Sequence, residues 1–263
     1  MSSNGSSPVV KSADRTVQLL EHLAGAQGSH SLNQLHQDLG IPKSSLHGLL
    51  RTLMHHGWIE TDRSGTRFKL GVRALLVGTS YIDGDEVVRA TAHVMDELGE
   101  DTAETIHLGR LDTGPPVAEV VYLATRQSRH HLRMFSRVGR RLPAHATALG
   151  KAMLAGHPDE NLEVLLSEPL PALTSHTICN LPNLRKELEV IRTRGYAMDW
   201  EENTVGIGCV GVALPLIGGT SGAPRDAISV SVPLARFSEQ RAEDLAGTLI
   251  GAIESLRPGI SRI

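Results

Sequence analysis

The stretch SLNQLHQDLGIPKSSLHGLLRTLMHHG, residues 31–57, decides the fold of the N-terminal part of this chain. Ser31 and Gln34 form a capping-box pattern ahead of a short helix that Gly40 ends. A second helix follows, and Pro42 suits its first turn because the missing N–H costs nothing there. Apolar residues in this second helix recur at spacings of three and four, which predicts one buried stripe: Leu46, Leu49, Leu50, Leu53 and Met54. Two helices around a glycine turn indicate a helix-turn-helix.

The flanking sequence extends this unit on both sides. Residues 13–24 show helical spacing of apolar side chains and precede the helix-turn-helix. Residues 58–60 and 67–70 read as two short strands around a turn at 62–65. A hairpin directly after a helix-turn-helix is a wing, so we expect a winged helix-turn-helix over residues 9–70. The polar Ser- and Gly-rich residues 1–8 are expected to be a mobile, disordered tail.

The second helix of a helix-turn-helix enters the major groove of DNA with its N-terminal residues. The buried stripe leaves a set of side chains facing outward, and these can bind phosphates or base edges: Lys43, Ser44, Ser45, His47 and Arg51. Arg67, together with Arg63 and Lys69, lies on the predicted wing and could hold the adjacent backbone. An alternative is a signalling module without DNA, in which the helical pair serves only for dimerisation.

Charge is distributed unevenly along the 263 residues. The whole chain has 26 Lys and Arg against 29 Asp and Glu, a formal net charge of -3, which by itself argues against a generic nucleic-acid-coating protein. The first eighty residues carry eight basic and five acidic side chains, whereas the remainder carries 18 and 24. A basic unit on an acidic body is what a specific DNA-binding protein needs.

Composition excludes several other classes. Hydrophobic residues make up 40% of the chain, so it is not disordered throughout. Two cysteines cannot build a disulfide framework. No apolar stretch reaches the ~18 residues of a membrane span, and the first twenty residues contain no signal-peptide core. We therefore expect a cytoplasmic protein with no membrane partner.

The second half of the chain mixes helices and strands in an α+β order. Helical patterns at residues 71–82 and 87–98 suggest a linker, with the boundaries of a linker helix at 71–84 and of a second domain at 85–263. We expect strands at 105–108, 117–123, 132–138, 196–200, 207–217 and 227–234, and helices at 146–155, 158–167, 184–194 and 238–256. Residues 218–225 read as a loop.

Three long patterns resemble the IclR family of bacterial transcriptional regulators over residues 9–263. The first is the winged unit, the second is VGRRLPAHATALGKAMLA at 138–155, and the third is GYAMDWEENTVGIGCVGVALPL at 195–216 with ISVSVP at 228–233. The resemblance implies a C-terminal GAF-like α/β domain that binds a small-molecule effector. One departure is Gly48, where the family usually has a large basic residue in the recognition helix.

The resemblance also implies an effector pocket, and its candidate residues transfer position by position. Ala148 and Leu149 come from a loop and helix, where free N–H groups could meet a carboxylate, and Asp199, Cys209, Ser229 and Ser231 come from the sheet. His131 and Met134 lie in a predicted strand beside them. A histidine at 131 would make the pocket more polar, which favours an acidic or polar effector. Residues 126–141 hold six arginines and no acid, interpreted mostly as a solvated edge strand with Arg133 nearest the pocket.

An enzyme is the main rival class, and we expect none. Cys209 lies in an apolar strand without a neighbouring histidine or activating motif, so a catalytic thiol is disfavoured. Glu201 and Glu202 read as structural carboxylates on a turn, facing solvent or pairing with a nearby arginine. The adjacent histidine pairs at 55–56 and 130–131 point in different directions and do not suit metal chelation. No cofactor and no metal are expected.

The resemblance implies how such a regulator would work. Homodimers formed through the winged unit and its linker helix would present two recognition helices to a near-palindromic operator in double-stranded DNA. The effector domains would join these as dimers of dimers. Effector binding would change operator affinity, more often as a repressor, with a ligand-dependent activator as the alternative.

Overall fold

A computed structural model describes residues 9–25, 28–114, 117–134, 136–216 and 222–256 of the chain. The chain divides into two compact units, Met1–Gly84 and Asp85–Ile263, which we describe separately. Two sequence expectations lie outside the described residues, in full or in part: the mobile tail at 1–8 and the first half of the loop at 218–225. None of the helices in the described part combines the length and apolar character that a membrane span needs.

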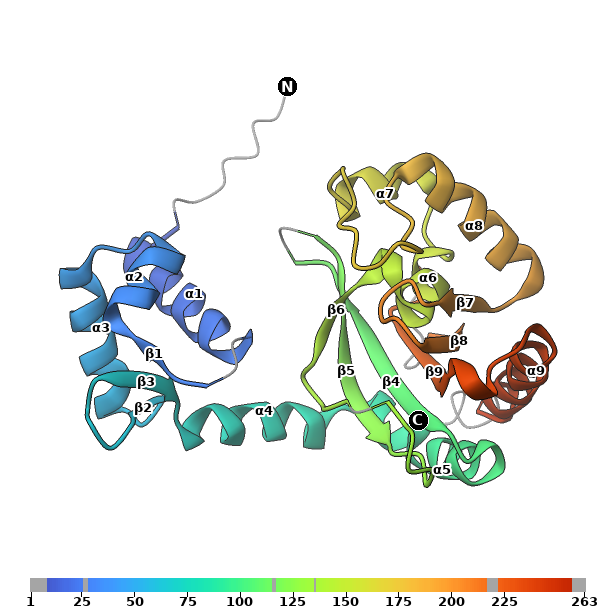
Figure 1. The fold of residues 1–263 in the computed structure, drawn as a ribbon, viewed down its shortest axis with the longest axis horizontal. Coiled ribbons are helices and arrows are strands. Elements are labelled where there is room, and N and C mark those ends of the chain that lie inside the picture. The colour runs from blue at the N-terminus through green and yellow to red at the C-terminus, as the bar shows by residue number, and fades with distance from the viewer. Residues whose placement is uncertain (1–8, 26–27, 115–116, 135, 217–221, 257–263) are drawn as a thin grey trace. The chain divides into compact units, whose positions relative to one another are not determined.

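The first unit contains helices and one small sheet (Figure 1). Its elements are α1 (Lys11–Gly25), β1 (His30–Ser31), α2 (Leu32–Leu39), α3 (Lys43–His55), β2 (Ile59–Thr61), β3 (Arg67–Leu70) and α4 (Val72–Gly84). The three strands are antiparallel in the order β1-β3-β2. This arrangement is a winged helix-turn-helix, as the sequence predicts, and β1 adds a third strand to the wing.

Local sequence signals account for the ends of α2 and α3. Both hydrogen bonds of the capping box form between Ser31 and Gln34, and Gly40 ends α2 with φ +63°. Pro42 is the N-cap of α3, one residue ahead of its expected place inside the first turn. Together these signals confirm the predicted helix-turn-helix.

The core of the first unit joins α1, α2 and α3. Leu19 and Leu23 of α1 pack with buried residues of the helix-turn-helix, and the full buried set is Leu19, Leu23, Leu35, Ile41, Leu46, Leu50, Leu53 and Ile59. Met54 does not belong to it, because it lies at the edge of the apolar stripe and is 37% exposed. The predicted stripe is therefore narrower than the spacing alone suggests.

The second unit is built on one six-stranded antiparallel sheet. Its elements are α5 (Glu86–Thr102), β4 (Thr105–Asp112), β5 (Glu119–Arg126), β6 (Arg141–Pro143), η1 (Ala144–Ala146), α6 (Ala148–Leu154), α7 (Asp159–Leu165), α8 (Leu181–Arg194), β7 (Ala197–Trp200), β8 (Ile207–Ala213), β9 (Asp226–Pro233), η2 (Leu234–Arg236) and α9 (Glu239–Ser255). The strand order is β6-β5-β4-β9-β8-β7. The central neighbours β4 and β9 are more than a hundred residues apart in sequence.

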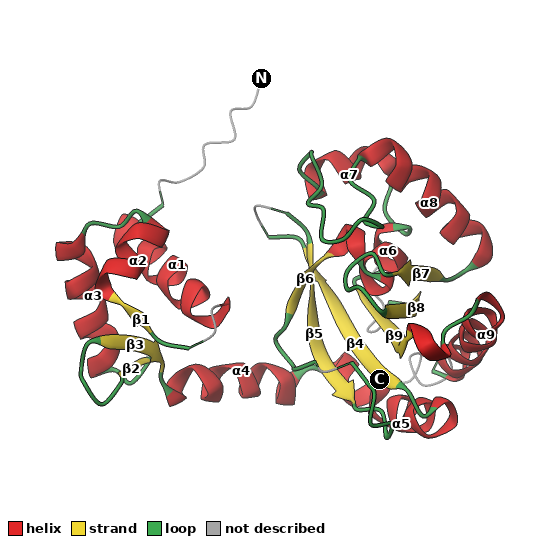
Figure 2. Cartoon of the chain, in the orientation of Figure 1, coloured by secondary structure: helices red, strands yellow, loops and turns green. Residues whose placement is uncertain are grey.

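Helices cover both faces of this sheet, as Figure 2 shows. The helix α6 packs on one face against β7, β8 and β9, with α7 and α8 outside it. The helices α5 and α9 pack against each other and cover the other face. This three-layer arrangement confirms the expected α/β domain and places the N-terminal end of α6 directly over the sheet.

One expected strand, at residues 132–138, is wrong. The described residues of the segment 127–140 (127–134 and 136–140) form no strand, and the edge of the sheet is formed instead by β6, which pairs with Glu119–Val121 of β5. The guanidinium of Arg236 binds the carbonyl oxygen of Leu132. The N–H of Gly139 donates to the carbonyl oxygen of Tyr122. These contacts hold the segment against the unit without a ladder of strand hydrogen bonds.

Candidate functional site

The outer face of α3 carries the residues expected to meet DNA. Ser44 and Arg51 lie on the side of the helix away from the buried Leu46 and Leu50. Lys43, Ser44, His47 and Arg51 are exposed and Ser45 is half-buried. In the described part of the chain neither Lys43 nor Arg51 forms an ion pair, so both positive charges remain available to an anionic partner.

Gly48 sits in the middle of this outer face. A Cβ placed there would meet nothing within 4 Å, so the glycine is not required by packing inside the unit. Beside it runs a groove of about 580 Å³ between α1 and α3, lined by Val10, Lys11, Ser12, Arg15, Ser44, Ser45, Gly48 and Leu49. Arg15 donates from Nη1 to Oγ of Ser45 at 3.2 Å. Lys11 and Arg15 are therefore basic neighbours of α3 that sequence spacing did not single out.

The wing residues are partly engaged within the unit. Arg67 donates to Oγ of Ser29 at 3.1 Å and to the Ser29 carbonyl oxygen at 2.5 Å. Lys69 lies 3.5 Å from a carboxylate oxygen of Glu60. Arg67 thus holds the loop before β1 against the wing through two of its five N–H donors, and the hydrogen bonds to Ser29 leave the other three for a phosphate.

A cavity lies in the second unit between α6, the sheet and the loop after β7. Its lining residues are Tyr122, Met134, Leu142, Thr147, Ala148, Leu149, Asp199, Asn203, Thr204, Ile207, Cys209, Ser229 and Ser231. Its volume is about 10 Å³, near the smallest space that one water molecule occupies. Seven of the eight effector residues expected from sequence line this one cavity.

His131 is the exception, and its expected place in the pocket is wrong. It is exposed, because the described residues around it, 127–134, form no strand that would turn it inward. Arg133 is also exposed and donates to the carbonyl oxygen of His130. Sequence reasoning missed six lining residues: Tyr122, Leu142, Thr147, Asn203, Thr204 and Ile207. Asn203 and Thr204 follow Asp199 in the same quoted block, which is the one signal that could have found them.

Two glycines let α6 lie on the sheet at this point. A Cβ on Gly211 of β8 would fall 2.8 Å from the carbonyl carbon of Ala148. A Cβ on Gly150 would fall 2.1 Å from the carbonyl oxygen of Ala144. Only glycine permits such close backbone contact, so Gly211 lets the start of α6 lie against β8 and Gly150 lets α6 lie against η1.

Asp199, Cys209 and Ser231 lie side by side across three strands. Asp199 of β7 is opposite Cys209 of β8, which is opposite Ser231 of β9, so their side chains share one face of the sheet. Asp199 is buried, and its Oδ1 accepts from the backbone N–H of Glu202 at 2.7 Å and of Asn203 at 3.4 Å. Burial, followed by the nearby Glu202 carboxylate, raises the pKa of Asp199 to about 7.

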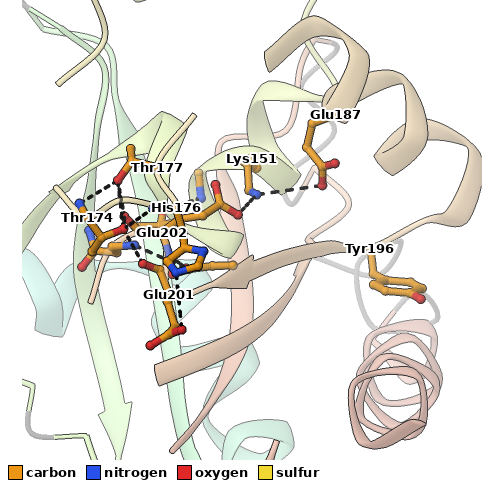
Figure 3. A network of polar contacts seen from close by, with 12 residues as sticks. Lys151, Thr174, His176, Thr177, Glu187, Tyr196, Glu201 and Glu202 are labelled. Atoms are coloured by element: carbon orange, nitrogen blue, oxygen red, sulfur yellow. Dashed lines mark hydrogen bonds and ion pairs between the residues drawn. The ribbon is translucent and has the colours of Figure 1, made fainter. Parts of the chain in front are cut away.

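A buried ion pair supports the loop that carries Asn203 and Thr204 (Figure 3). Lys151 of α6 is 1% exposed and donates to Oε1 of Glu202, and its ammonium lies 3.9 Å from Glu187. Thr174 and Thr177 donate to the carbonyl oxygens of Glu201 and Glu202, each at 2.6 Å. Glu202 is thus structural, as expected, but it is buried and pairs with lysine rather than facing solvent or arginine.

The thiol of Cys209 has the properties of a contact group rather than a nucleophile. It is buried, and burial raises its pKa well above the ordinary value. Its Sγ lies 3.2 Å from Oγ of Ser231. Among the described residues, no group of three His, Cys, Asp or Glu side chains is placed to hold a metal ion.

Comparison with known proteins matches both units to one family. The profile of the IclR helix-turn-helix domain matches residues 12–63, and that of the C-terminal domain of bacterial transcriptional regulator IclR matches residues 79–256. The chain is 30% identical to the transcriptional repressor IclR of Escherichia coli over 94% of this chain and 89% of that protein. It is 32% identical to the glycerol operon regulatory protein of Streptomyces coelicolor over 96% of each chain.

Solved structures share the fold. An IclR homologue from Microbacterium hydrocarbonoxydans, crystallised in complex with 4-hydroxybenzoate, superimposes with a TM-score of 0.72 at 23% identity. The match covers 94% of this chain and 99% of that one.

Proposed function

The chain belongs to the IclR family of bacterial transcriptional regulators, and we propose that it represses transcription from a near-palindromic operator and that a small polar or acidic effector changes its affinity for that operator. The family consists of DNA-binding regulators, not enzymes. Repression is favoured over activation because similar proteins include the repressor IclR of Escherichia coli and the acetate operon repressor of Salmonella typhimurium.

The exposed face of α3 is the observation that carries the DNA-binding part of this proposal. Lys43 and Arg51 offer charges without an internal carboxylate partner, at positions where a recognition helix meets the major groove. Ser44, Ser45 and His47 would add hydrogen bonds to phosphates or bases. Arg67 would add a wing contact through the N–H groups that do not bind Ser29.

The cavity beneath α6 supports the effector-binding part. Asp199, Asn203, Ser229 and Ser231 supply polar groups to a lining that also contains apolar side chains such as Met134, Leu142 and Leu149. The amide nitrogen of Asn203 is buried without a hydrogen-bond partner among the described residues, which provides a donor for an effector oxygen. Because the cavity volume is only about 10 Å³, an effector larger than a water molecule must displace lining groups. An effector that binds the displaced arrangement more tightly shifts the protein towards it, which is what allosteric coupling requires.

The helix α4 supports self-association. It has no buried residue in the chain by itself, and its exposed apolar side chains are Val72, Leu75, Leu76, Val77 and Tyr81. Covering this surface would favour a homodimer through α4 and the winged unit. A dimer would present two copies of α3 to half-sites about one helical turn apart, and pairing of effector domains would give dimers of dimers. Analytical ultracentrifugation with Leu75→Glu against the unchanged protein tests this assembly.

We place this activity in the cytoplasm, where operator DNA lies, and assign no catalytic role to the cavity. The raised pKa of the Cys209 thiol keeps it protonated and therefore weakly nucleophilic.

A gel-shift assay with DNA from upstream of the protein's own gene tests the proposal. We expect retardation at moderate salt, and release when the effector is added as a pool of small organic acids. Ser229→Ala combined with Ser231→Ala should keep DNA affinity and weaken the effector response. Absence of retardation with and without the pool would refute the DNA-binding regulator. Retardation with a full response in the double variant would refute the placement of the effector.

A further inference from the structure

A line of buried polar side chains runs beneath the cavity and out to the irregular segment at 127–140. Ser136 Oγ lies 2.6 Å from Nε2 of His107, whose Nδ1 lies 3.3 Å from Oγ of Ser231. Ser231 in turn contacts Cys209. His107 of β4 has no solvent-exposed surface and does not line the cavity, whereas Ser231 and Cys209 do. The imidazole therefore joins a cavity residue to a residue outside the cavity.

The imidazole of His107 carries a single proton at neutral pH. Burial, with a smaller effect from the Arg140 charge, lowers its pKa to about 3. A neutral ring donates from one nitrogen and accepts at the other, and both nitrogens here face a serine hydroxyl. The position of that one proton therefore decides the hydrogen-bond direction at both serines.

The two tautomers leave Ser231 in different states. With the proton on Nε2, His107 donates to Ser136 and accepts from the hydroxyl of Ser231, which then has only lone pairs left for a ligand. With the proton on Nδ1, His107 donates to Ser231, and the hydroxyl of Ser231 is free to donate. The forms differ only in which ring nitrogen holds the proton and how two hydroxyls are rotated, so no proton is gained or lost.

We propose that His107 is a positioning residue of the effector site, and that an effector with a carboxylate or carbonyl oxygen at Ser231 selects the Nδ1–H tautomer and reverses the hydrogen bond at Ser136. This proposal rests on the effector cavity of the proposed function. It also specifies the chemistry of the ligand: the group that meets Ser231 is an oxygen that accepts a hydrogen bond, not an alcohol that donates one. It also provides a route from the cavity to the segment 127–140, which carries both Ser136 and the cavity residue Met134.

The first test needs no ligand. Histidine ring ¹⁵N spectra of the full chain distinguish the tautomers, and His107→Gln assigns the His107 signal by its loss. In Ser231→Ala the ring keeps its partner at Ser136, so we expect Nε2–H. In Ser136→Ala the ring keeps its partner at Ser231, so we expect Nδ1–H. The same tautomer in both variants, with native thermal unfolding, would overturn the relay.

The second test adds ligands to the unchanged protein and to Ser136→Ala. The probes are pyruvate and 4-hydroxybenzoate as acids and glycerol as an alcohol. A bound acid should convert the ligand-free signal to Nδ1–H and glycerol should not. Because Ser136→Ala already favours that tautomer, it should bind the acid about five-fold more tightly, from the ~1 kcal/mol of one hydrogen bond.

A matched control lies on the same segment. Ser128 donates to the carbonyl oxygen of Ala103, and among the described residues it forms no hydrogen bond with His107, so Ser128→Ala should leave acid affinity unchanged. A bound acid that leaves the proton on Nε2 would overturn our inference about His107. If neither acid binds the unchanged protein, the acidic effector of the proposed function is contradicted for these acids, and the ligand-free comparison of the two serine variants still decides the relay.

Discussion

Replacing Asp199 by Asn should make the second unit more stable, and increasingly so as pH rises. Burial, followed by the Glu202 charge, raises the pKa of Asp199 from the ordinary value of 3.8 to about 7. Between pH 3.8 and 7 the folded protein holds the proton of Asp199 more tightly than the unfolded chain does. The contribution of this carboxyl to folding stability is therefore fully present below pH 3.8 and is lost as pH rises through 7. Asn cannot ionise, and its side-chain oxygen can still accept from the N–H groups of Glu202 and Asn203.

The size of the effect follows from the shift. A displacement of about three pKa units corresponds to at most about 4 kcal/mol above pH 7, at ~1.4 kcal/mol per unit. At pH 5.5 the loss of folding stability is about 2 kcal/mol, because at this pH Asp199 is ionised in the unfolded chain but still protonated in the folded protein. The stability advantage of Asp199→Asn should therefore grow by about 2 kcal/mol between pH 5.5 and 8.5.

Urea unfolding followed by tryptophan fluorescence measures this difference. The chain has two tryptophans, and in a Trp58→Phe background only Trp200 remains, next to Asp199 and packed on Phe237. Asp101→Asn, at an exposed carboxylate, serves as the control and should show no comparable change with pH. An advantage of Asp199→Asn that is equal at pH 5.5 and 8.5 would show that Asp199 does not hold the proton.

Three further changes test the cavity and the DNA face. Lys151→Met should destabilise the second unit by about 3–5 kcal/mol, because it leaves Glu202 buried and unpaired. Adding Glu202→Leu should recover much of this loss. If urea unfolding shows no recovery in the double variant, the role of the pair is contradicted. Gly150→Ala should lower the free energy of unfolding by about 3 kcal/mol, because its Cβ would clash with the backbone at Ala144. Gly247→Ala, at an open helix position, should instead raise it by about 0.5–1 kcal/mol. Equal melting temperatures for the two variants would refute the packing argument. Arg51→Ala should weaken operator binding and reduce the slope of affinity against salt by about one; an unchanged slope in a titration from low to moderate salt would show that Arg51 does not contact phosphate.

Much of the first unit is predictable because its signals are local. The capping box at Ser31 and the leucine spacing in α3 each act within one or two helical turns. Met54 was misjudged because spacing gives the direction of a side chain but not how far the neighbouring core extends. The wing strands were found, but the contact of Arg67 with Ser29 crosses 38 residues and has no local signal.

The second unit shows the limit of local signals more clearly. The sequence predicts a strand at 132–138, yet β6 forms that edge of the sheet by pairing with β5, which local sequence does not indicate. The prediction that His131 lies in the pocket is wrong for the same reason, since it depends on that strand. The local sequence does not indicate that Glu202 is buried, because its partner Lys151 is 51 residues away.

By itself the sequence determined the kinds of elements, the winged unit, and seven residues that do gather around one cavity. These follow from periodicity, capping and a resemblance carried by long motifs. Only the tertiary structure decided which side chains meet: the pairing of β4 with β9 brings His107 to Ser231 across 124 residues. The physical reason is that strand pairing and helix packing join segments distant in sequence, so burial, pKa and hydrogen-bond partners are properties of the assembled sheet.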